Sequence, residues 1–475
     1  MARSVLIGSF VVLVAGAALA ACSDGDTTAP PPGDTTTGSG NAGPGGSGGA
    51  TSSTGPTTSS SSAGGAGGIG GSGGAGGAGG GVGGAGGNNT GGAGGVGVGG
   101  SGGAGGAAPM DQDSDGWTPA DGDCCDNDAN CSDPELVNPG AFEYLGNSLD
   151  DDCDPATPDL VPVPDCGGSA LAIPTSSIEL IHAMDLCQET TESPPLNLKK
   201  WGVISSALVR ADGSAAPAPA DVQTGVLAAF GPNVLPKRGA TMAAISSGTA
   251  RAVGDPGYVH PQNGPLVGQV GNYNANTQSG APPEYLAANG GSLPSPPACP
   301  ACVGPNCTQA FDSVNLKARI RVPTNALSFS YNFKFYSAEF PEFLCEQYND
   351  FFVTLLTSAE PTIPADKNIA FDAAQNPVSV NNAFFEVCFP PIGAPAGTCP
   401  SGTFDLVGNG MGGWGNAIDD GGGTVWLVNE SPIVPGETID IEFVLWDAGD
   451  HNVDSLALLD RFRWSVTPST VGVHR

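Results

Sequence analysis

Short runs of alternating apolar and polar residues dominate the second half of the chain. The alternation is clearest over residues 316–322, 326–336 and 438–447, and it has the period of a strand with one buried face. Shorter apolar runs bounded by turn residues predict further strands at 201–209, 224–230, 242–248, 351–356, 424–428 and 456–464. Many short strands with few helices between them predict a mainly β domain over residues 161–475, a β-sandwich with jelly-roll-like topology.

One helix is expected before these strands. Ser176 and Glu179 have the spacing of a capping box, in which each side chain bonds the backbone N–H of the other residue. Apolar residues then follow at helical spacing: Leu180, Ile181, Met184 and Cys187.

The N-terminal segment has the pattern of an export signal. One basic residue, Arg3, precedes an apolar run over 5–18 that is too short for a stable transmembrane helix. The run is followed by the tetrapeptide LAAC, ending at Cys22, which resembles the lipobox of bacterial lipoproteins. The resemblance implies a signal peptide over residues 1–21 and acylation of Cys22. The protein would then be held in the cell envelope by lipid, at the outer membrane and exposed on the cell surface. The alternative is ordinary secretion with a free Cys22.

Residues 22–109 are almost entirely Gly, Ala, Ser, Thr and Pro, with the sequence GGAGG recurring. Such a segment has too few large side chains to form a core, so we expect a disordered linker behind the lipidated cysteine. A Gly-rich coil of about 85 residues has a root-mean-square span of about 50 Å. The linker would therefore act as a tether.

The charge of the chain is strongly negative and unevenly distributed. The formal net charge is −32, and 23 of the 47 acidic residues lie between Arg3 and Lys199, where there is no lysine or arginine. This acidity excludes a basic surface for nucleic acid and makes cations the natural small partners.

The segment 111–154 concentrates the acidic residues. Asp111, Asp113 and Asp115 alternate before Gly116, which places three carboxylates on one side of a tight loop, as a hard cation requires. The expected ion is Ca²⁺. The twelfth position counted from Asp111 is Gly122 rather than a bidentate Glu, so the loop is not an EF-hand.

More acidic residues and four cysteines follow this loop. The order DxDxDG, GDC, VNPGAFE and GNSLDDDCD resembles a metal-binding motif of bacterial surface and secreted proteins, and it predicts a small disulfide-rich calcium-binding module at residues 110–160. We call this module the cassette. The candidate ligands are Asp111, Asp113, Asp115, Asp121, Asp123, Glu143, Asp150 and Asp152. The alternative is a solvated acidic linker.

The chain has thirteen cysteines, and acylation of Cys22 would leave an even number for disulfides in an oxidising compartment. The disulfide candidates are Cys124, Cys125, Cys131, Cys153, Cys166, Cys187, Cys299, Cys302, Cys307, Cys345, Cys388 and Cys399. Local pairs are expected for Cys166 with Cys187 and for Cys388 with Cys399, which leaves the four cysteines between 299 and 345 to pair among themselves. The spacing from Cys299 to Cys302 also fits a zinc or redox site, but the chain has no second CxxC motif to support it. The doubled cysteine at 124–125 leaves the pairing within the cassette open.

Segments 328–356, 368–371, 377–382 and 435–459 resemble the choice-of-anchor L domain, and two earlier segments resemble its N-terminal portion, so the resemblance spans residues 170–466. It implies a β-rich module on an exported bacterial protein, here anchored by lipid. Acidic residues at the ends of the expected strands form a second candidate metal site that would join two sheets: Glu339, Glu342, Asp350, Asp447, Asp450 and Asp454. The alternative is that Glu339 and Asp447 cap turns.

Outside the Gly-rich linker, motifs of several enzyme classes are absent from the sequence: it has no HExxH, no GxSxG and no Gly-rich phosphate loop ending in GK. Ser246 or Ser247 on a turn, or the carboxylates of Glu339 and Glu342, are the available catalytic candidates, but no spacing supplies their partners. We therefore expect a non-enzymatic surface module that binds an extracellular protein or glycan. The alternatives are a structural component of the envelope and, third, a hydrolase acting on glycosides or esters.

Overall fold

The computed structural model describes residues 110–475 apart from 130, 158, 160–165, 167, 172, 216–217, 220, 262–276, 298, 301, 303, 347, 382–384, 391–397 and 413–420. The signal peptide, Cys22 and the linker at 22–109 lie outside the described residues. Among the residues described, none of the helices combines the length and the hydropathy that crossing a bilayer requires.

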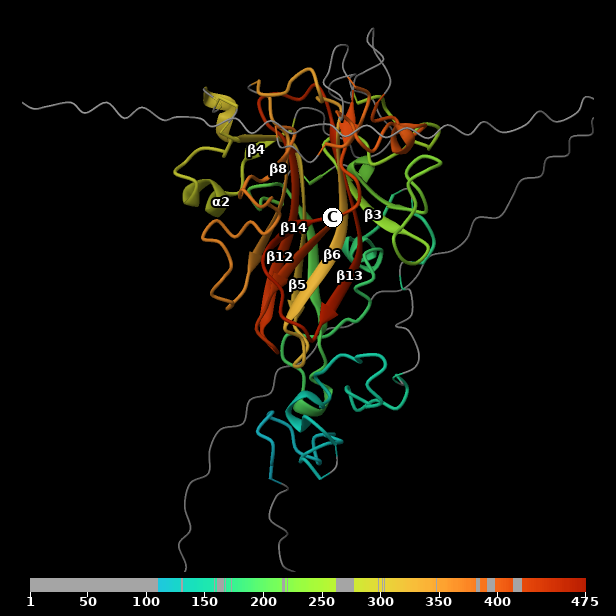
Figure 1. Cartoon of the computed structure of the whole chain (residues 1–475), viewed down its shortest axis with the longest axis vertical. Helices are drawn as coiled ribbons and strands as arrows, with labels where there is room; N and C mark the ends of the chain where they lie inside the picture. The colour runs from blue at the N-terminus through green and yellow to red at the C-terminus, as the bar shows by residue number, and fades with distance from the viewer. Residues whose placement is uncertain are drawn as a thin grey trace, which may run out of the picture. The chain divides into compact units, whose positions relative to one another are not determined.

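The described residues form two antiparallel sheets (Figure 1). The first sheet has six strands in the order β1-β5-β12-β7-β8, and β4 pairs with the start of β5. Its strands are β1 (Gly202–Val209), β4 (Gln278–Gly280), β5 (Gln309–Arg321), β7 (Phe351–Thr357), β8 (Val378–Ser379) and β12 (Thr438–Asp447).

The second sheet has eight strands in the order β14-β11-β6-β13-β3-β2, and β10 joins β9 to β6. Its strands are β2 (Thr224–Leu227), β3 (Met242–Ser246), β6 (Ser328–Ser337), β9 (Val387–Cys388), β10 (Gly422–Gly423), β11 (Leu427–Pro432), β13 (Ser455–Ser465) and β14 (Gly472–His474).

The two sheets pack face to face through the apolar residues of the alternating runs. Val314, Leu316, Ala318 and Ile320 on β5 share one buried cluster with Phe329, Tyr331, Phe333 and Phe335 on β6. The ring of Tyr331 lies 5.1 Å from that of Phe443 on β12, and its hydroxyl shares a hydrogen bond with Thr354 on β7. Each sheet therefore supplies one wall of a common core.

The mainly β fold class and the jelly-roll-like sandwich are confirmed. Successive long strands change sheet: β5, β6 and β7 alternate between the two sheets, and so do β11, β12 and β13. The predicted bounds of β12 agree with the structure at both ends, because its first half alternates and a continuous apolar run then extends the strand to Trp446.

Other boundaries differ from the predicted ones. The segment 424–428 is a strand only from Leu427, because Thr424 instead bonds to Phe335 through its backbone N–H and its hydroxyl oxygen. Likewise, β5 begins at Gln309, seven residues before the predicted start, since its first part buries polar residues that the alternation rule does not recognise.

The predicted helix is α1 (Ser177–His182), and the backbone N–H of Ser176 donates to the Glu179 carboxylate at 3.1 Å. It ends before Cys187 because Asp185 adopts a φ of 69°, which is incompatible with a continuing helix. One further α-helix, α2 (Pro283–Ala288), was not expected. Short 3₁₀ helices lie at Pro134–Leu136, Leu196–Leu198, Asp221–Gln223, Pro305–Thr308 and Phe404–Leu406.

Six disulfides occur among the described residues: Cys124–Cys153, Cys125–Cys131, Cys166–Cys187, Cys299–Cys345, Cys302–Cys307 and Cys388–Cys399. They account for all twelve candidate cysteines. The CxxC cysteines at 299 and 302 are in two different disulfides, which leaves no thiol there for zinc.

Candidate metal centres and a cavity

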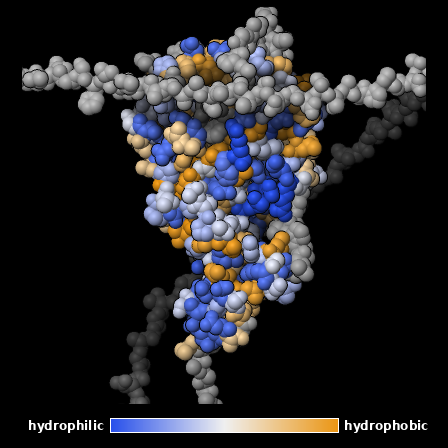
Figure 2. Space-filling model, in the orientation of Figure 1, coloured by the Kyte–Doolittle hydropathy of each residue, from blue (hydrophilic) through white to orange (hydrophobic). Residues whose placement is uncertain are grey.

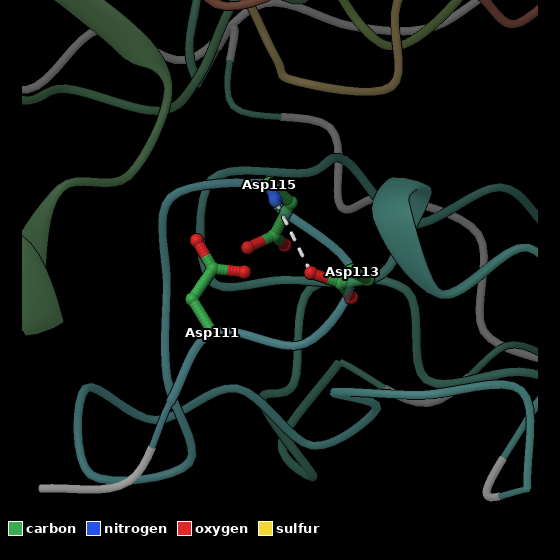
Figure 3. A group of neighbouring side chains, drawn as sticks. All are labelled: Asp111, Asp113 and Asp115. Atoms are coloured by element: carbon green, nitrogen blue, oxygen red, sulfur yellow. Dashed lines mark hydrogen bonds between the residues drawn. The ribbon is translucent and has the colours of Figure 1, made fainter.

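The aspartates of the DxDxDG loop converge on one point (Figure 3). One carboxylate oxygen from each of Asp111, Asp113 and Asp115 lies within 4.8 Å of the others. Backbone N–H groups orient them: Ser114 and Gly116 donate to Asp111, Asp115 donates to Asp113 at 3.1 Å, and Trp117 donates to Asp115 at 2.7 Å. The loop can turn this tightly because Gly116 has a φ of 98°.

Asp113 also belongs to a second group of carboxylates, with Asp123 and Asp126. Asp126 was not among the candidate ligands. It is buried and is held by the backbone and side chain of Gln112, at 2.9 and 2.7 Å. Its place in the same Asp-rich run was the only sequence signal for it.

A third group joins Glu143, Asp150 and Asp152 within the same distance limit. Seven of the eight candidate ligands therefore fall into the three groups. The eighth, Asp121, lies apart and accepts a hydrogen bond from the Thr118 hydroxyl at 2.7 Å.

Each group holds carboxylate oxygens that no described donor satisfies. They are Oδ2 of Asp113, Asp115 and Asp123, Oε1 of Glu143 and Oδ1 of Asp150. Burial, and then repulsion by neighbouring carboxylates, raises the pKa of Asp115 to about 6 and that of Glu143 to about 7. These groups therefore favour a bound proton or a bound cation over free carboxylates, and oxygen ligands at this spacing suit Ca²⁺.

The cassette packs directly on the sandwich, and both belong to one compact unit. Trp117 is buried and its Nε1 donates to the carbonyl of Leu196 at 3.1 Å. The loop between β5 and β6 contacts the cassette at a second place. Asn325 exchanges two hydrogen bonds with the backbone of Phe142, and the Thr324 hydroxyl donates to Asn138 at 2.7 Å.

A cavity of about 560 Å³ lies where the cassette meets the sandwich. We call it the cassette cavity. Its walls carry the aromatic rings of Phe142, Tyr144, Trp201, Phe462 and Trp464 and the guanidinium groups of Arg238, Arg461 and Arg463. Three acids also line it: Asp185, and Glu143 and Asp152 of the third acidic group.

The end of β13 places aromatic and arginine side chains in this cavity. The register of β13 against β6 shifts between Asp460 and Arg463, and Arg461 has a φ of 55°. A bulge of this kind turns consecutive side chains toward one side of the strand. Burial, and then repulsion from Arg461 and Arg238, lowers the pKa of Arg463. The three arginines therefore lie close enough to repel one another, and Glu430 offsets part of that repulsion at Arg463.

A separate set of carboxylates lies inside the sandwich, where strands of both sheets end. Glu339, Asp350, Asp447 and Asp454 are all buried, and we call them the inter-sheet cluster. Glu339 follows β6 and Asp454 precedes β13 in the second sheet, whereas Asp350 precedes β7 and Asp447 ends β12 in the first. The Ser455 hydroxyl donates to Asp350 Oδ2 at 2.6 Å and so connects the two sheets.

Burial is the main cause of the shifted pKa values in this cluster. It raises the pKa of Asp350 to about 7 and the pKa values of Glu339, Asp447 and Asp454 well above their usual range. Repulsion adds to the effect of burial, since Asp350 acts on Glu339, Asp447 and Asp454.

The cluster differs from the second metal site expected from the sequence. Glu342 is exposed and does not join it, while Asp450 is half-buried at its edge and raises the pKa of Glu339. Asp312 was missed because it lies in the part of β5 that the alternation did not predict. It is buried, accepts two hydrogen bonds from Thr277 and one from His451 at 2.9 Å, and raises the pKa of Asp454.

The backbone N–H of Asp350 lowers the pKa of Glu339 and the Ser247 hydroxyl lowers that of Asp447, so the alternative that these two acids cap turns stays a prediction. The alternative of an accessible serine on a turn is wrong. Ser246 and Ser247 are not presented on an open turn: both are buried, and their hydroxyls donate to the carbonyl of Ser455.

Part of the sandwich matches a known protein family. Residues 307–462 match the family model of the choice-of-anchor L domain. The match runs from just before β5 into β13, and it contains every member of the inter-sheet cluster. It leaves out the cassette and the N-terminal part of the resemblance, residues 170–306. Choice-of-anchor L domains are non-enzymatic surface modules, so the match indicates a β module of the cell surface or envelope. No curated protein and no solved structure matches the chain.

Proposed function

We propose that this protein is a calcium-stabilised, non-catalytic module on the cell surface that binds an extracellular glycan carrying acidic groups. The observation that supports the proposal is the cassette cavity, whose walls combine five aromatic rings with three arginines beside an acidic metal group. Aromatic faces stack on the C–H surfaces of sugar rings, and the planar guanidinium group binds carboxylate or sulfate through two parallel hydrogen bonds.

Calcium would make this cavity fit an anion. Glu143 and Asp152 line the cavity and belong to the group that includes Asp150, so their negative charge faces the same space as the arginines. A divalent cation held by these acids would offset two of their three negative charges. With Asp185 in the same wall, the three arginines would then leave an excess of one positive charge at the cavity. Binding of the glycan should therefore depend on calcium.

On the face that Figure 2 shows, hydrophilic and hydrophobic residues are interspersed. A discrete cavity with few charged anchors fits a small saccharide unit better than it fits a broad protein interface.

The proposal is tested with the full chain on an array of neutral and acidic oligosaccharides, in calcium and in EGTA. We expect binding to acidic members in calcium and its loss in EGTA. Equal binding of neutral and acidic members would contradict the proposal. Binding to no member would contradict it too, and would leave a protein ligand or a purely structural role in the envelope.

Arginine variants locate the site. Arg463→Gln should weaken binding of the acidic glycan by about 2 kcal/mol, since truncating a central arginine of an interface has costs of this order. Arg319→Gln is the matched control, because Arg319 lies outside the cavity and pairs with Glu192 and Asp440 on the surface. Equal affinities of the two variants in a calorimetric titration would place the ligand elsewhere.

Attachment to the membrane through Cys22 is part of the proposal and rests on the lipobox. Cys22→Ala should move the protein from the membrane fraction to the soluble fraction and abolish labelling with palmitate, because stable anchoring requires the buried acyl chains. Ser23→Ala serves as the control and should keep both properties. A Cys22→Ala protein that still takes up palmitate would show that the lipid anchor is assigned wrongly.

A further inference from the structure

A second cavity shares a wall with the cassette cavity. It measures about 290 Å³, and Arg463 and Trp464 line both cavities. We call it the serine cavity, because five of its ten lining residues carry a hydroxyl group: Ser328, Ser330, Ser465, Thr467 and Ser469. A ligand longer than one sugar unit can therefore extend from the cassette cavity past Arg463 and Trp464.

Strand pairing builds the floor of the serine cavity. Ser330 on β6 pairs with Arg463 on β13 and with Glu430 on β11. Phe329, the residue before Ser330, is buried in the core between the sheets, so alternation turns Ser330 to the opposite face of the second sheet. The serine cavity therefore lies on the outer face of this sheet, at the end of β13.

The chain after β13 forms the side of the serine cavity. The Ser328 hydroxyl donates to the carbonyl of Thr467 at 2.7 Å, and the backbone N–H of Thr467 donates to the Ser465 hydroxyl oxygen at 3.0 Å. These bonds hold the segment that continues to Ser469 beside the sheet. The cavity is therefore preformed, which favours the binding of a small ligand.

The charges in the serine cavity balance each other. Its charged residues are Arg463 and Glu430, and Glu430 offsets part of the repulsion that Arg463 experiences. The cassette cavity, by contrast, has three arginines. Hydroxyl groups donate and accept hydrogen bonds, as the hydroxyls of a sugar do, so the lining of the serine cavity fits an uncharged sugar unit.

Two buried polar atoms of the residues that line the serine cavity have no hydrogen-bond partner in the described part of the chain. They are Nε1 of Trp464 and the hydroxyl oxygen of Ser469. The indole N–H only donates, whereas the hydroxyl both donates and accepts. A buried polar group without a hydrogen bond is unfavourable, so a ligand rich in hydroxyl groups gains affinity by pairing with these atoms.

We propose that the serine cavity is a second binding subsite, which takes an uncharged sugar unit next to the acidic unit in the cassette cavity. The inference rests on the proposed function and narrows it, since the shortest complete ligand is then a disaccharide of one acidic and one neutral sugar. Arg463 is exposed and lines both subsites. Its guanidinium group has five N–H donors, enough to bond an acidic group of one unit and a hydroxyl of the next.

Defined sugars test the second subsite by calorimetric titration of the full chain in calcium. The probes are glucuronic acid and two disaccharides of glucuronic acid and glucose, with the acid at the one or the other end. We expect one disaccharide to bind about tenfold tighter than glucuronic acid, because a single additional hydrogen bond has an effect of this order.

Equal affinities for glucuronic acid and both disaccharides would overturn the second subsite and leave the proposed function standing. Failure of all three probes to bind would also overturn it. The array of neutral and acidic oligosaccharides decides the proposed function separately, so the two failures can be told apart.

Variants of the serine cavity locate the neutral unit. Ser330→Leu narrows the cavity, and Ser469→Ala removes a hydroxyl that no described residue bonds, so the second change leaves the protein's own hydrogen bonds intact. Both should remove most of the gain in affinity for the disaccharide and leave the affinity for glucuronic acid unchanged. Ser205→Leu is the matched control, because Ser205 is exposed on β1 and lines neither cavity.

The variant Arg463→Gln should weaken binding of glucuronic acid and of the disaccharide alike, because Arg463 lines both subsites. Thermal unfolding identifies any variant that has lost its fold. If Ser330→Leu and Ser469→Ala both bind the disaccharide as tightly as Ser205→Leu does, the proposal is wrong. Equal losses for glucuronic acid and the disaccharide in Ser469→Ala would contradict it too.

Discussion

Replacing Asp113 and Asp115 with alanine should abolish most of the calcium-dependent stability of the cassette. Asp113 contributes to two of the acidic groups and Asp115 to one, so the double variant removes ligands from both. An ion that binds only the folded state stabilises it by about 2.7 kcal/mol at a free concentration about 100 times its dissociation constant. Calorimetric titration and thermal unfolding, each in calcium and in EGTA, measure this difference.

The matched control for this variant is Asp128→Ala. Asp128 is exposed and belongs to none of the three groups, so its loss should leave the calcium titration unchanged. Magnesium should stabilise the parent much less than calcium, because the smaller ion gives up its water reluctantly. A parent chain that unfolds at the same temperature in calcium and in EGTA would mean that the acidic groups serve only as a solvated surface.

Phe333→Ala should lower the free energy of unfolding by about 3–5 kcal/mol, because removing a large buried ring leaves a cavity that the core cannot fill. Phe333 is fully buried on β6, and its ring lies 5.1 Å from that of Phe352 across the sandwich. Phe404→Ala is the control: Phe404 is 66% exposed, so the change should stay within about 0.5 kcal/mol. Urea unfolding in calcium compares the two, and equal losses would contradict a core centred on β6.

The sequence predicted the sandwich where local pattern and burial agree. In β12, residues 439, 441 and 443 are apolar and buried and alternate with polar ones, and the apolar run over 443–446 completes the strand. The same rule fails in the first part of β5, where Asp312 and Asn315 are polar and buried. Their burial depends on partners far along the chain, such as Thr277 and Glu442, which no local window contains.

The candidate sites also differ in whether a local stretch of sequence is enough to predict them. The spacing of Asp111, Asp113 and Asp115 defines their group by itself, because three alternating residues in one loop must lie close together. The inter-sheet cluster depends on strand pairing: Asp350 and Asp447 meet only because Phe351 pairs with Trp446. The cavity was not predicted at all, since it requires the docking of the cassette on β13.

The disulfides also determine how the protein carries mechanical tension. A pull on the N-terminal side enters at residue 110 and passes through the DxDxDG loop to Cys124. It then crosses to Cys153 through the disulfide, so the tension bypasses the covalent chain between these cysteines, which carries Glu143, Asp150 and Asp152. The Cys166–Cys187 disulfide shields α1 in the same manner. The loop that carries Asp111, Asp113 and Asp115 would therefore unfold under tension before the wall of the cassette cavity. The module would lengthen under flow while that wall stays folded.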